Sequence, residues 1–215
     1  MRSRQASASS SSAGSIQGSP RAAGALIGAL AAGVVASLVL AAGAAQAKVF
    51  HARQDALKLA FPDAERIEKR TFILKPDQIA AIRTAARAKT DSRLVTIFTA
   101  WKQGAVLGHA HIDVHTVRTH PSALLVVWTP EGEVRSVRIL AFHEPLDYLP
   151  AEKWYLQFEG ATLEDKLRVG GDVHGVVNAT LSTRVASDSV RRALAYHALL
   201  IAPEAAAPDS PQQEP

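Results

Sequence analysis

A threonine at the junction of a polar loop and a helix is the first candidate for chemistry. The stretch Asp172–Arg192 reads DVHGVVNATLSTRVASDSVRR, a loop rich in Gly, Asp and Asn that runs into Thr180. Behind Thr180, apolar residues recur at helical spacing. The first turn of a helix has unpaired backbone N–H groups and a partial positive charge. Thr180 can therefore cap the helix, or its oxygen can hold a phosphate where an anion is stabilised.

Three histidines on one face of an expected strand are a second candidate. Residues 105–114 alternate, with apolar side chains on one face. The other face and the end of the strand carry His109, His111, Asp113 and His115. Neighbouring neutral imidazoles can bind Zn²⁺ or Cu²⁺, although no second cluster completes a ligand set. The alternative is the solvated polar face of an edge strand.

Two further groups suit an anionic or planar ligand. Arg118 lies in a polar loop, and arginine makes bidentate contacts to phosphate. A cluster of acidic and aromatic side chains lies beside two prolines: Glu144, Tyr148, Leu149 and Trp154. A rigid loop with aromatic side chains suits stacking on a planar ligand. The alternatives are an exposed surface arginine and a hydrophobic lid on the sheet.

The elements that must position these residues form an α+β pattern. Helices are expected at residues 51–61, from 75 to about 90, at 151–158 and from 180 to about 200. Strands are expected at 65–74, 94–102, 105–114, 122–129 and 133–142, with a slip of register near Ser136. Their spacing predicts an antiparallel meander. We therefore expect a single α+β domain with a central antiparallel sheet flanked by helices packed at its ends.

The two ends of the chain differ from this domain. Residues 1–47 have a basic start, an apolar run and an Ala-x-Ala site before Lys48, which together predict an export signal. An uncleaved inner-membrane anchor made by residues 24–45 is the alternative, because this apolar run is about as long as a spanning helix of ~20 residues. The domain then covers 48–200. Residues 201–215 are rich in Pro, Ala and Gln and are expected to be a disordered tail.

Composition excludes several classes of function. The 215 residues carry a net charge of +4, but removing residues 1–47 leaves 21 basic against 20 acidic residues, a net charge of +1. Nucleic-acid binding is not expected, because it requires a clustered basic face. The chain has no cysteine, which excludes disulfides, thioether-linked haem and Cys-ligated iron–sulfur clusters. An electron carrier of this composition needs another cofactor.

The segment around Thr180 resembles the FMN-binding domain family. That family includes the flavin-bearing subunits of the Rnf complex and of the sodium-pumping NADH–quinone reductase. Its motif is an Asp, a short apolar run, Ser/Thr-Gly-Ala-Thr and a helix, and it is matched here by Asp172, Val177-Asn178-Ala179-Thr180 and Leu181-Ser182. A second segment, Glu144-Pro145 followed by 154–160, is similar to a family loop and short helix. The resemblance covers most of residues 48–200.

The resemblance implies FMN joined to Thr180 by a phosphodiester bond. It implies maturation by a separate Mg²⁺-dependent flavin transferase that uses FAD. It also implies electron transfer outside the cytoplasm, between a membrane or periplasmic donor and acceptor, by a carrier rather than a stand-alone enzyme. The residues expected around the cofactor are Asn178, Leu181, Ser182, Arg118, Glu144, Tyr148, Leu149 and Trp154.

One departure from the family motif precedes the threonine. Val177-Asn178 stands where the family has Ser/Thr-Gly. Glycine at such a position usually serves a positive φ, and Asn is among the few other residues that tolerate it. We therefore expect Asn178 to preserve the turn. The alternative functions are a flavin-free binding or assembly domain of the same fold, and an exported metal-binding protein that uses the histidine face.

Overall fold

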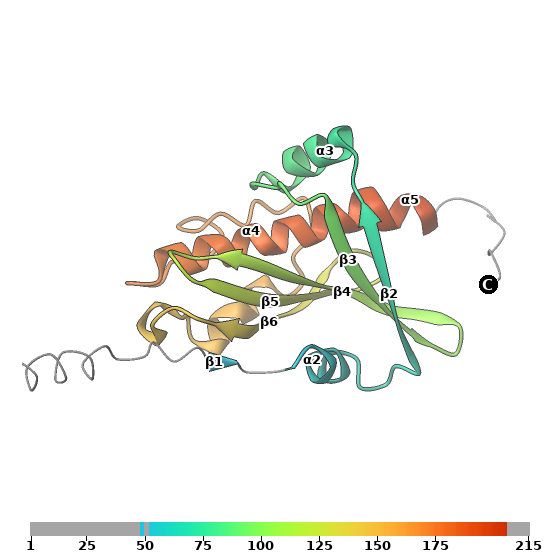
Figure 1. Cartoon of the computed structure of the whole chain (residues 1–215), viewed down its shortest axis with the longest axis horizontal. Coiled ribbons are helices and arrows are strands. Elements are labelled where there is room, and N and C mark those ends of the chain that lie inside the picture. The colour runs from blue at the N-terminus through green and yellow to red at the C-terminus, as the bar shows by residue number, and fades with distance from the viewer. Residues whose placement is uncertain (1–47, 50–51, 206–215) are drawn as a thin grey trace, which may run out of the picture. The chain divides into compact units, whose positions relative to one another are not determined.

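The described part of the chain is an α+β domain built on one antiparallel sheet (Figure 1). The computed structural model describes residues 48–49 and 52–205, so the expected export signal or anchor and residues 206–215 lie outside the described residues. The strands are β1 (Lys48–Val49), β2 (Arg66–Ile73), β3 (Leu94–Lys102), β4 (Ala105–Thr116), β5 (Pro121–Trp128) and β6 (Val134–Phe142). The helices are α2 (Arg53–Ala60), α3 (Pro76–Ala86), α4 (Thr180–Tyr196), α5 (Ala202–Ala205), the 3₁₀ segments η1 (Leu146–Tyr148) and η2 (Glu152–Phe158), and the π-helical turn η3 (His197–Ile201).

The strands follow the predicted meander. Their order is β1-β6-β5-β4-β3-β2, and every neighbouring pair is antiparallel. The predicted slip near Ser136 is confirmed, because the pairing shifts between Val127–Ser136 and Trp128–Val134. Strand β4, which carries the histidines, lies inside the sheet between β3 and β5.

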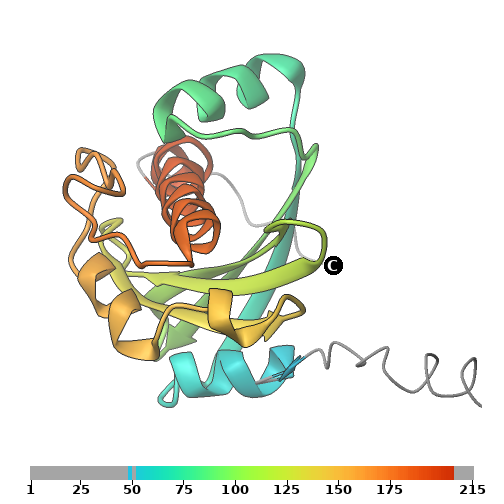
Figure 2. The same ribbon diagram turned by 90° about the vertical axis from the view of Figure 1, so that its left-hand side faces the viewer.

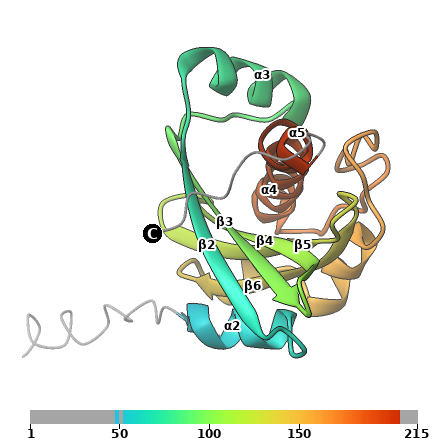
Figure 3. The ribbon, with the colours of Figure 1, turned by 90° about the vertical axis from the view of Figure 1, so that its right-hand side faces the viewer.

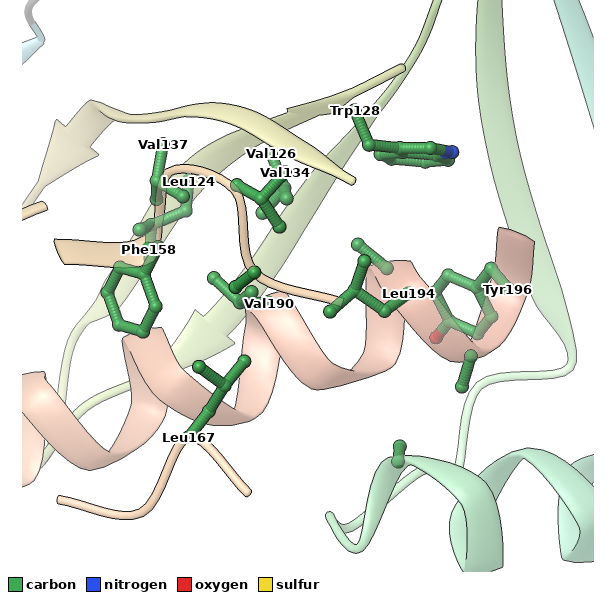
Figure 4. Close-up of a cluster of buried hydrophobic side chains, with 14 of the residues drawn as sticks. Leu124, Val126, Trp128, Val134, Val137, Phe158, Leu167, Val190, Leu194 and Tyr196 are labelled. Atoms are coloured by element: carbon green, nitrogen blue, oxygen red, sulfur yellow. The ribbon is translucent and has the colours of Figure 1, made fainter. Parts of the chain in front are cut away.

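The two faces of the sheet are covered by different helices (Figures 2 and 3). Helix α4 lies across one face, where Val190 and Leu194 are buried against strand side chains such as Val126 and Trp128 (Figure 4). Helix α2 covers part of the opposite face, where its Leu57 joins a separate buried cluster. The predicted antiparallel sheet flanked by helices is confirmed. Helix α4 packs on a face of the sheet and not at its end, because its apolar side chains are buried against those of the strands.

The C-terminal end of the helix runs further than expected. Helical structure continues from α4 through η3 and α5 to Ala205, past the predicted start of the tail at residue 201. Arg70 of β2 forms a salt bridge with Glu204, which attaches α5 to the edge strand. None of the helices within residues 52–205 is both long and apolar enough to cross a bilayer.

Candidate functional site

The start of α4 forms one wall of a cavity of about 420 Å³. Residues from three separate parts of the chain line it: Val117, Arg118, Tyr148, Asn178, Thr180, Leu181 and Ser182. Six of these seven are among the residues predicted from the sequence. The structure therefore brings together the expected attachment threonine, the loop arginine and one of the aromatic residues.

The backbone before Thr180 makes the turn that the sequence predicts. Asn178 has a φ of 67°, so the expectation that it takes the place of a positive-φ glycine is confirmed. The amide of Ala179 then donates to the carbonyl of Val176 (3.1 Å), and the amide of Thr183 donates to the carbonyl of Ala179 (2.9 Å). The chain thus enters α4 through a closed turn. The side chain of Val177 is 87% exposed beside it.

Thr180 is the first helical residue and does not cap the helix. Ala179 occupies the capping position, and no side-chain hydrogen bond caps α4. Thr180 is exposed, whereas the next two hydroxyl residues, Ser182 and Thr183, are buried. The capping alternative is therefore wrong, and Thr180 is open to solvent at the start of the helix.

The opposite wall of the cavity carries a positive charge on an aromatic ring. The guanidinium carbon of Arg118 lies 4.5 Å from the centre of the Tyr148 ring, a cation–π contact. The hydroxyl of Ser182 donates to the carbonyl of Tyr148 (2.5 Å) and so ties the first turn of α4 to η1. Arg118 and the first-turn N–H groups of α4 both favour an anion in this cavity.

Glu144 shapes the cavity without lining it. Its Oε1 accepts hydrogen bonds from the backbone amides of Arg118 (3.0 Å), Thr119 (2.7 Å) and His120 (2.9 Å). These bonds lower the pKa of Glu144 to about 2, and the bonds from Thr119 and His120 contribute most. Burial acts in the opposite direction. The expectation that Glu144 contacts a ligand is replaced by a positioning role, because its carboxylate holds the loop that carries Arg118.

Leu149 and Trp154 also lie away from the cavity lining. Trp154 is buried, donates its indole N–H to the carbonyl of His174 (2.7 Å) and meets Phe158 edge-on. Leu149 is half-buried at the end of η1, where its amide donates to the carbonyl of Leu146 (3.0 Å). For Trp154 the alternative of a hydrophobic core residue therefore describes the structure better than a ligand contact.

The histidine face of β4 is covered by α4. His109 lies near Thr99 (Nδ1 to Oγ1, 3.0 Å), and burial, together with the nearby His197, lowers its pKa to about 4. His111 lies near the carbonyl of Thr96 (Nδ1 to O, 2.8 Å) and meets the ring of Tyr196 edge-on. The alternative of a solvated face on an edge strand is wrong, because the strand is internal and its polar side chains face the helix.

Asp113 is the centre of this buried polar face. Its Oδ2 accepts hydrogen bonds from Arg192 (2.6 Å) and Ser189, and lies 3.3 Å from Nδ1 of His115. Burial alone would raise the pKa of Asp113, but the nearby side chains of His111 and His115 and the charge and hydrogen bond of Arg192 hold it well below its usual range. The carboxylate is therefore ionised and fixes α4 to β4.

The sequence interpretation missed Ser189 and Arg192 as partners of Asp113. Their spacing of three residues on one face of the helix was a signal for a shared polar partner. The metal hypothesis gains no support, because within residues 52–205 no group of three or more His, Cys, Asp or Glu side chains is arranged to hold an ion. His109 and His111 instead contact protein groups.

The residues around Thr180 fit a flavin phosphate. The volume of about 420 Å³ lies within the range of roughly 300–1,000 Å³ for small-molecule sites. The lining combines an exposed hydroxyl, a guanidinium, an aromatic ring and the positive end of a helix, which are groups that accept a phosphate ester and a planar ring. No protein-family model matches the chain, and no match is found among curated proteins. The resemblance to the FMN-binding domain family therefore stays a prediction.

Proposed function

We propose that this chain is an extracytoplasmic electron-transfer protein that carries FMN covalently on Thr180. The proposed maturation step uses FAD as donor. The Thr180 hydroxyl oxygen bonds to the FMN phosphorus, the pyrophosphate bond breaks, AMP leaves and the hydroxyl proton is released. A separate Mg²⁺-dependent flavin transferase is the proposed catalyst. Bound FMN would supply reversible acceptance of electrons, which the side chains of a cysteine-free protein do not provide.

One observation carries the proposal. Thr180 is exposed at the start of α4, and Arg118 and Tyr148 line the same cavity. These residues are far apart in the sequence, and the sequence predicts each of them as a cofactor contact. In the proposed holoprotein, Arg118 and the first-turn amides of α4 offset the phosphate charge. Tyr148 and Leu181 offer apolar surface to the ring.

Glu144 and Asn178 have supporting roles in this proposal. The three backbone hydrogen bonds to Glu144 fix the loop that presents Arg118. The positive φ of Asn178 directs the chain into α4 so that Thr180 is exposed at its start. Neither residue needs to contact the cofactor for its substitution to reduce flavin attachment.

Coexpression with a flavin transferase tests the proposal directly. The expected product is yellow, shows in-gel flavin fluorescence after denaturation and gains the mass of one FMN moiety. Thr180→Ala should abolish all three signals. Thr84→Ala is the matched control, since it removes an exposed hydroxyl from α3, far from Thr180 in the sequence, and should be modified like the parent protein.

Two outcomes would contradict this function. Retention of covalent flavin by Thr180→Ala would show that another residue is the attachment point. A folded, colourless and unmodified parent protein would favour a flavin-free binding or assembly domain. The proposed membrane or periplasmic donor and acceptor are tested separately, by reduction and reoxidation of the purified holoprotein with membrane and soluble fractions.

A further inference from the structure

A second cavity, of about 280 Å³, has three arginines among its seven lining residues. It lies between α4 and the loop around Arg168, and its charged lining residues are Arg168, Arg184, Asp188 and Arg191. Three guanidinium groups against one carboxylate give this lining a net charge of +2. It shares no lining residue with the cavity at Thr180.

The helix and the loop bring the three arginines to one cavity. Arg184 and Arg191 are seven residues apart and therefore lie on one face of α4, two turns from each other. The hydroxyl of Ser187, on the same face, donates to the carbonyl of Leu167. Arg191 Nη1 donates to the carbonyl of Lys166 (3.1 Å). These two bonds fasten the loop to the helix.

The loop itself is closed by backbone bonds around Arg168. Its carbonyl accepts the amides of Gly171 (2.9 Å) and Val173 (3.1 Å), and Gly170 adopts a φ of 84° in the turn. The Arg168 amide also donates to Oδ2 of Asp172 (3.4 Å), so the Arg168 side chain starts from a defined backbone position at the cavity wall.

Arg191 has a hydrogen-bond donor that the described residues do not satisfy. Its side chain is only 16% exposed, and its Nη2 pairs with Asp188. Its Nε is buried and has no hydrogen-bond partner in the described part of the chain. Buried polar groups in folded proteins are nearly always paired, so the guanidinium of Arg191 keeps one donor that the described residues leave unsatisfied. Asp188 is already engaged by the same guanidinium.

We propose that this arginine cavity is a binding site for a phosphate oxyanion. Guanidinium groups match the geometry of phosphate oxygens and bind them through charge-assisted hydrogen bonds. An oxyanion would offset the excess positive charge of the lining. Free inorganic phosphate and the phosphate of a nucleotide share this chemistry. The site is distinct from the proposed flavin attachment and does not depend on it.

The cavity lies close to the proposed attachment residue along α4. Arg184 follows Thr180 by four residues on the same face of α4, which corresponds to about 6 Å along the helix axis. A nucleotide phosphate in this cavity would therefore lie about one helical turn from the proposed attachment residue. AMP, the leaving group of the proposed maturation step, is the nucleotide to test.

Calorimetric titration of the purified protein at low ionic strength tests the site. Inorganic phosphate should bind saturably with one site per chain, and sodium chloride at equal ionic strength should give no such isotherm. Arg168→Gln and Arg184→Gln should each weaken phosphate binding about tenfold, the loss expected for one strong charge-assisted contact. Arg138→Gln, which removes an exposed arginine on β6, should bind like the parent protein.

Titration with AMP distinguishes a nucleotide from free phosphate, and Thr180→Ala distinguishes phosphate binding from flavin attachment. Tighter binding of AMP than of inorganic phosphate assigns the site to a nucleotide, and equal or weaker binding assigns it to free phosphate. Thr180→Ala should keep phosphate binding even though it loses the flavin. The proposal is overturned if phosphate gives no saturable binding, or if Arg168→Gln and Arg184→Gln, folded by circular dichroism, bind it like the parent protein.

Discussion

The buried ion pair between β4 and α4 allows a quantitative prediction for Arg192→Met. Arg192 Nη2 lies 2.6 Å from Asp113 Oδ2, and each side chain is only 11% exposed. Methionine can occupy much of the space of the arginine stem, so the substitution removes the charge and the hydrogen bonds with little loss of packing. Asp113 then remains ionised in a buried site without its cationic partner.

The expected cost follows from the contacts that are lost and kept. Removing one partner of a buried ion pair typically costs about 3–5 kcal/mol of unfolding free energy. Arg192 Nη1 also donates to the carbonyl of Lys89 (3.1 Å), and this bond is lost too. Ser189 and His115 remain beside Asp113 and limit the penalty. We expect a loss of about 4 kcal/mol, a large part of the roughly 5–15 kcal/mol that stabilises a typical domain.

The loss should depend on pH in a defined direction. The pKa of Asp113 in the folded protein is lowered, so the ionised carboxylate stabilises the fold above its unfolded-state pKa of about 3.9. This contribution disappears as the pH falls toward the folded-state pKa. Without Arg192 the pKa of Asp113 rises, because burial is opposed by fewer partners. The difference in unfolding free energy between the parent protein and Arg192→Met should therefore be largest near neutral pH and should narrow below about pH 4.

Urea unfolding at pH 7 and pH 3.5, followed by tryptophan fluorescence, measures both effects. Arg138→Met is the control for loss of an exposed arginine and should change the free energy by about 0.5 kcal/mol or less. Combining Arg192→Met with Asp113→Leu should recover most of the loss, because no buried charge remains. A loss below about 1 kcal/mol at pH 7, or a double variant no more stable than Arg192→Met, would refute the reasoning.

Three further predictions concern single positions. Glu144→Gln should lower flavin attachment and lower the free energy of unfolding by about 1–3 kcal/mol by weakening the loop before β5. The pKa of Glu144 is lowered to about 2, so the parent protein loses this stabilisation only as the pH falls toward 2. Urea unfolding should therefore show the stability difference between parent and variant narrowing in strong acid. Asn178→Val should cost about 1–2 kcal/mol in the same assay and reduce flavin incorporation, whereas Asn178→Gly should retain both, because the φ of 67° suits glycine. Gly132→Ala should lower the melting temperature strongly, because its Cβ would lie 2.5 Å from Cδ2 of His197; Gly160→Ala, also at positive φ but in open space, should lower it less.

The sequence predicted the elements whose signals are local. Alternation of apolar residues and Gly/Pro turns placed β3 at Leu94–Lys102, with the bounds that the structure has. The positive φ of Asn178 was also a local inference, because few residue types tolerate that conformation. Arg118 and Tyr148 were predicted from the chemistry of their side chains as well as from the residue pattern, and both line the Thr180 cavity.

The sequence could not predict contacts that depend on how distant elements pack. The histidines of β4 alternate with apolar residues, which is typical of a half-exposed strand. Their burial depends on α4, and Arg192 is 79 residues from Asp113 in the chain. Glu144 was likewise predicted to contact a ligand, because a side-chain pattern cannot show that its partners are backbone amides. Of the three predicted cofactor contacts outside the cavity lining, Glu144 and Trp154 bond to backbone groups, and a side-chain pattern cannot reveal such partners.

Helix α4 carries the proposed attachment residue and the buried ion pair at well-separated positions. Arg192 follows Thr180 by twelve residues, about 18 Å along the helix axis. The first turn has its own attachment, because the hydroxyl of Ser182 donates to the carbonyl of Tyr148. Loss of the ion pair should therefore lower the unfolding free energy without displacing Thr180 from its cavity. Arg192→Met should accept flavin at low temperature as the parent does, whereas Glu144→Gln, which frees the Arg118 loop, should lose incorporation out of proportion to its loss of stability.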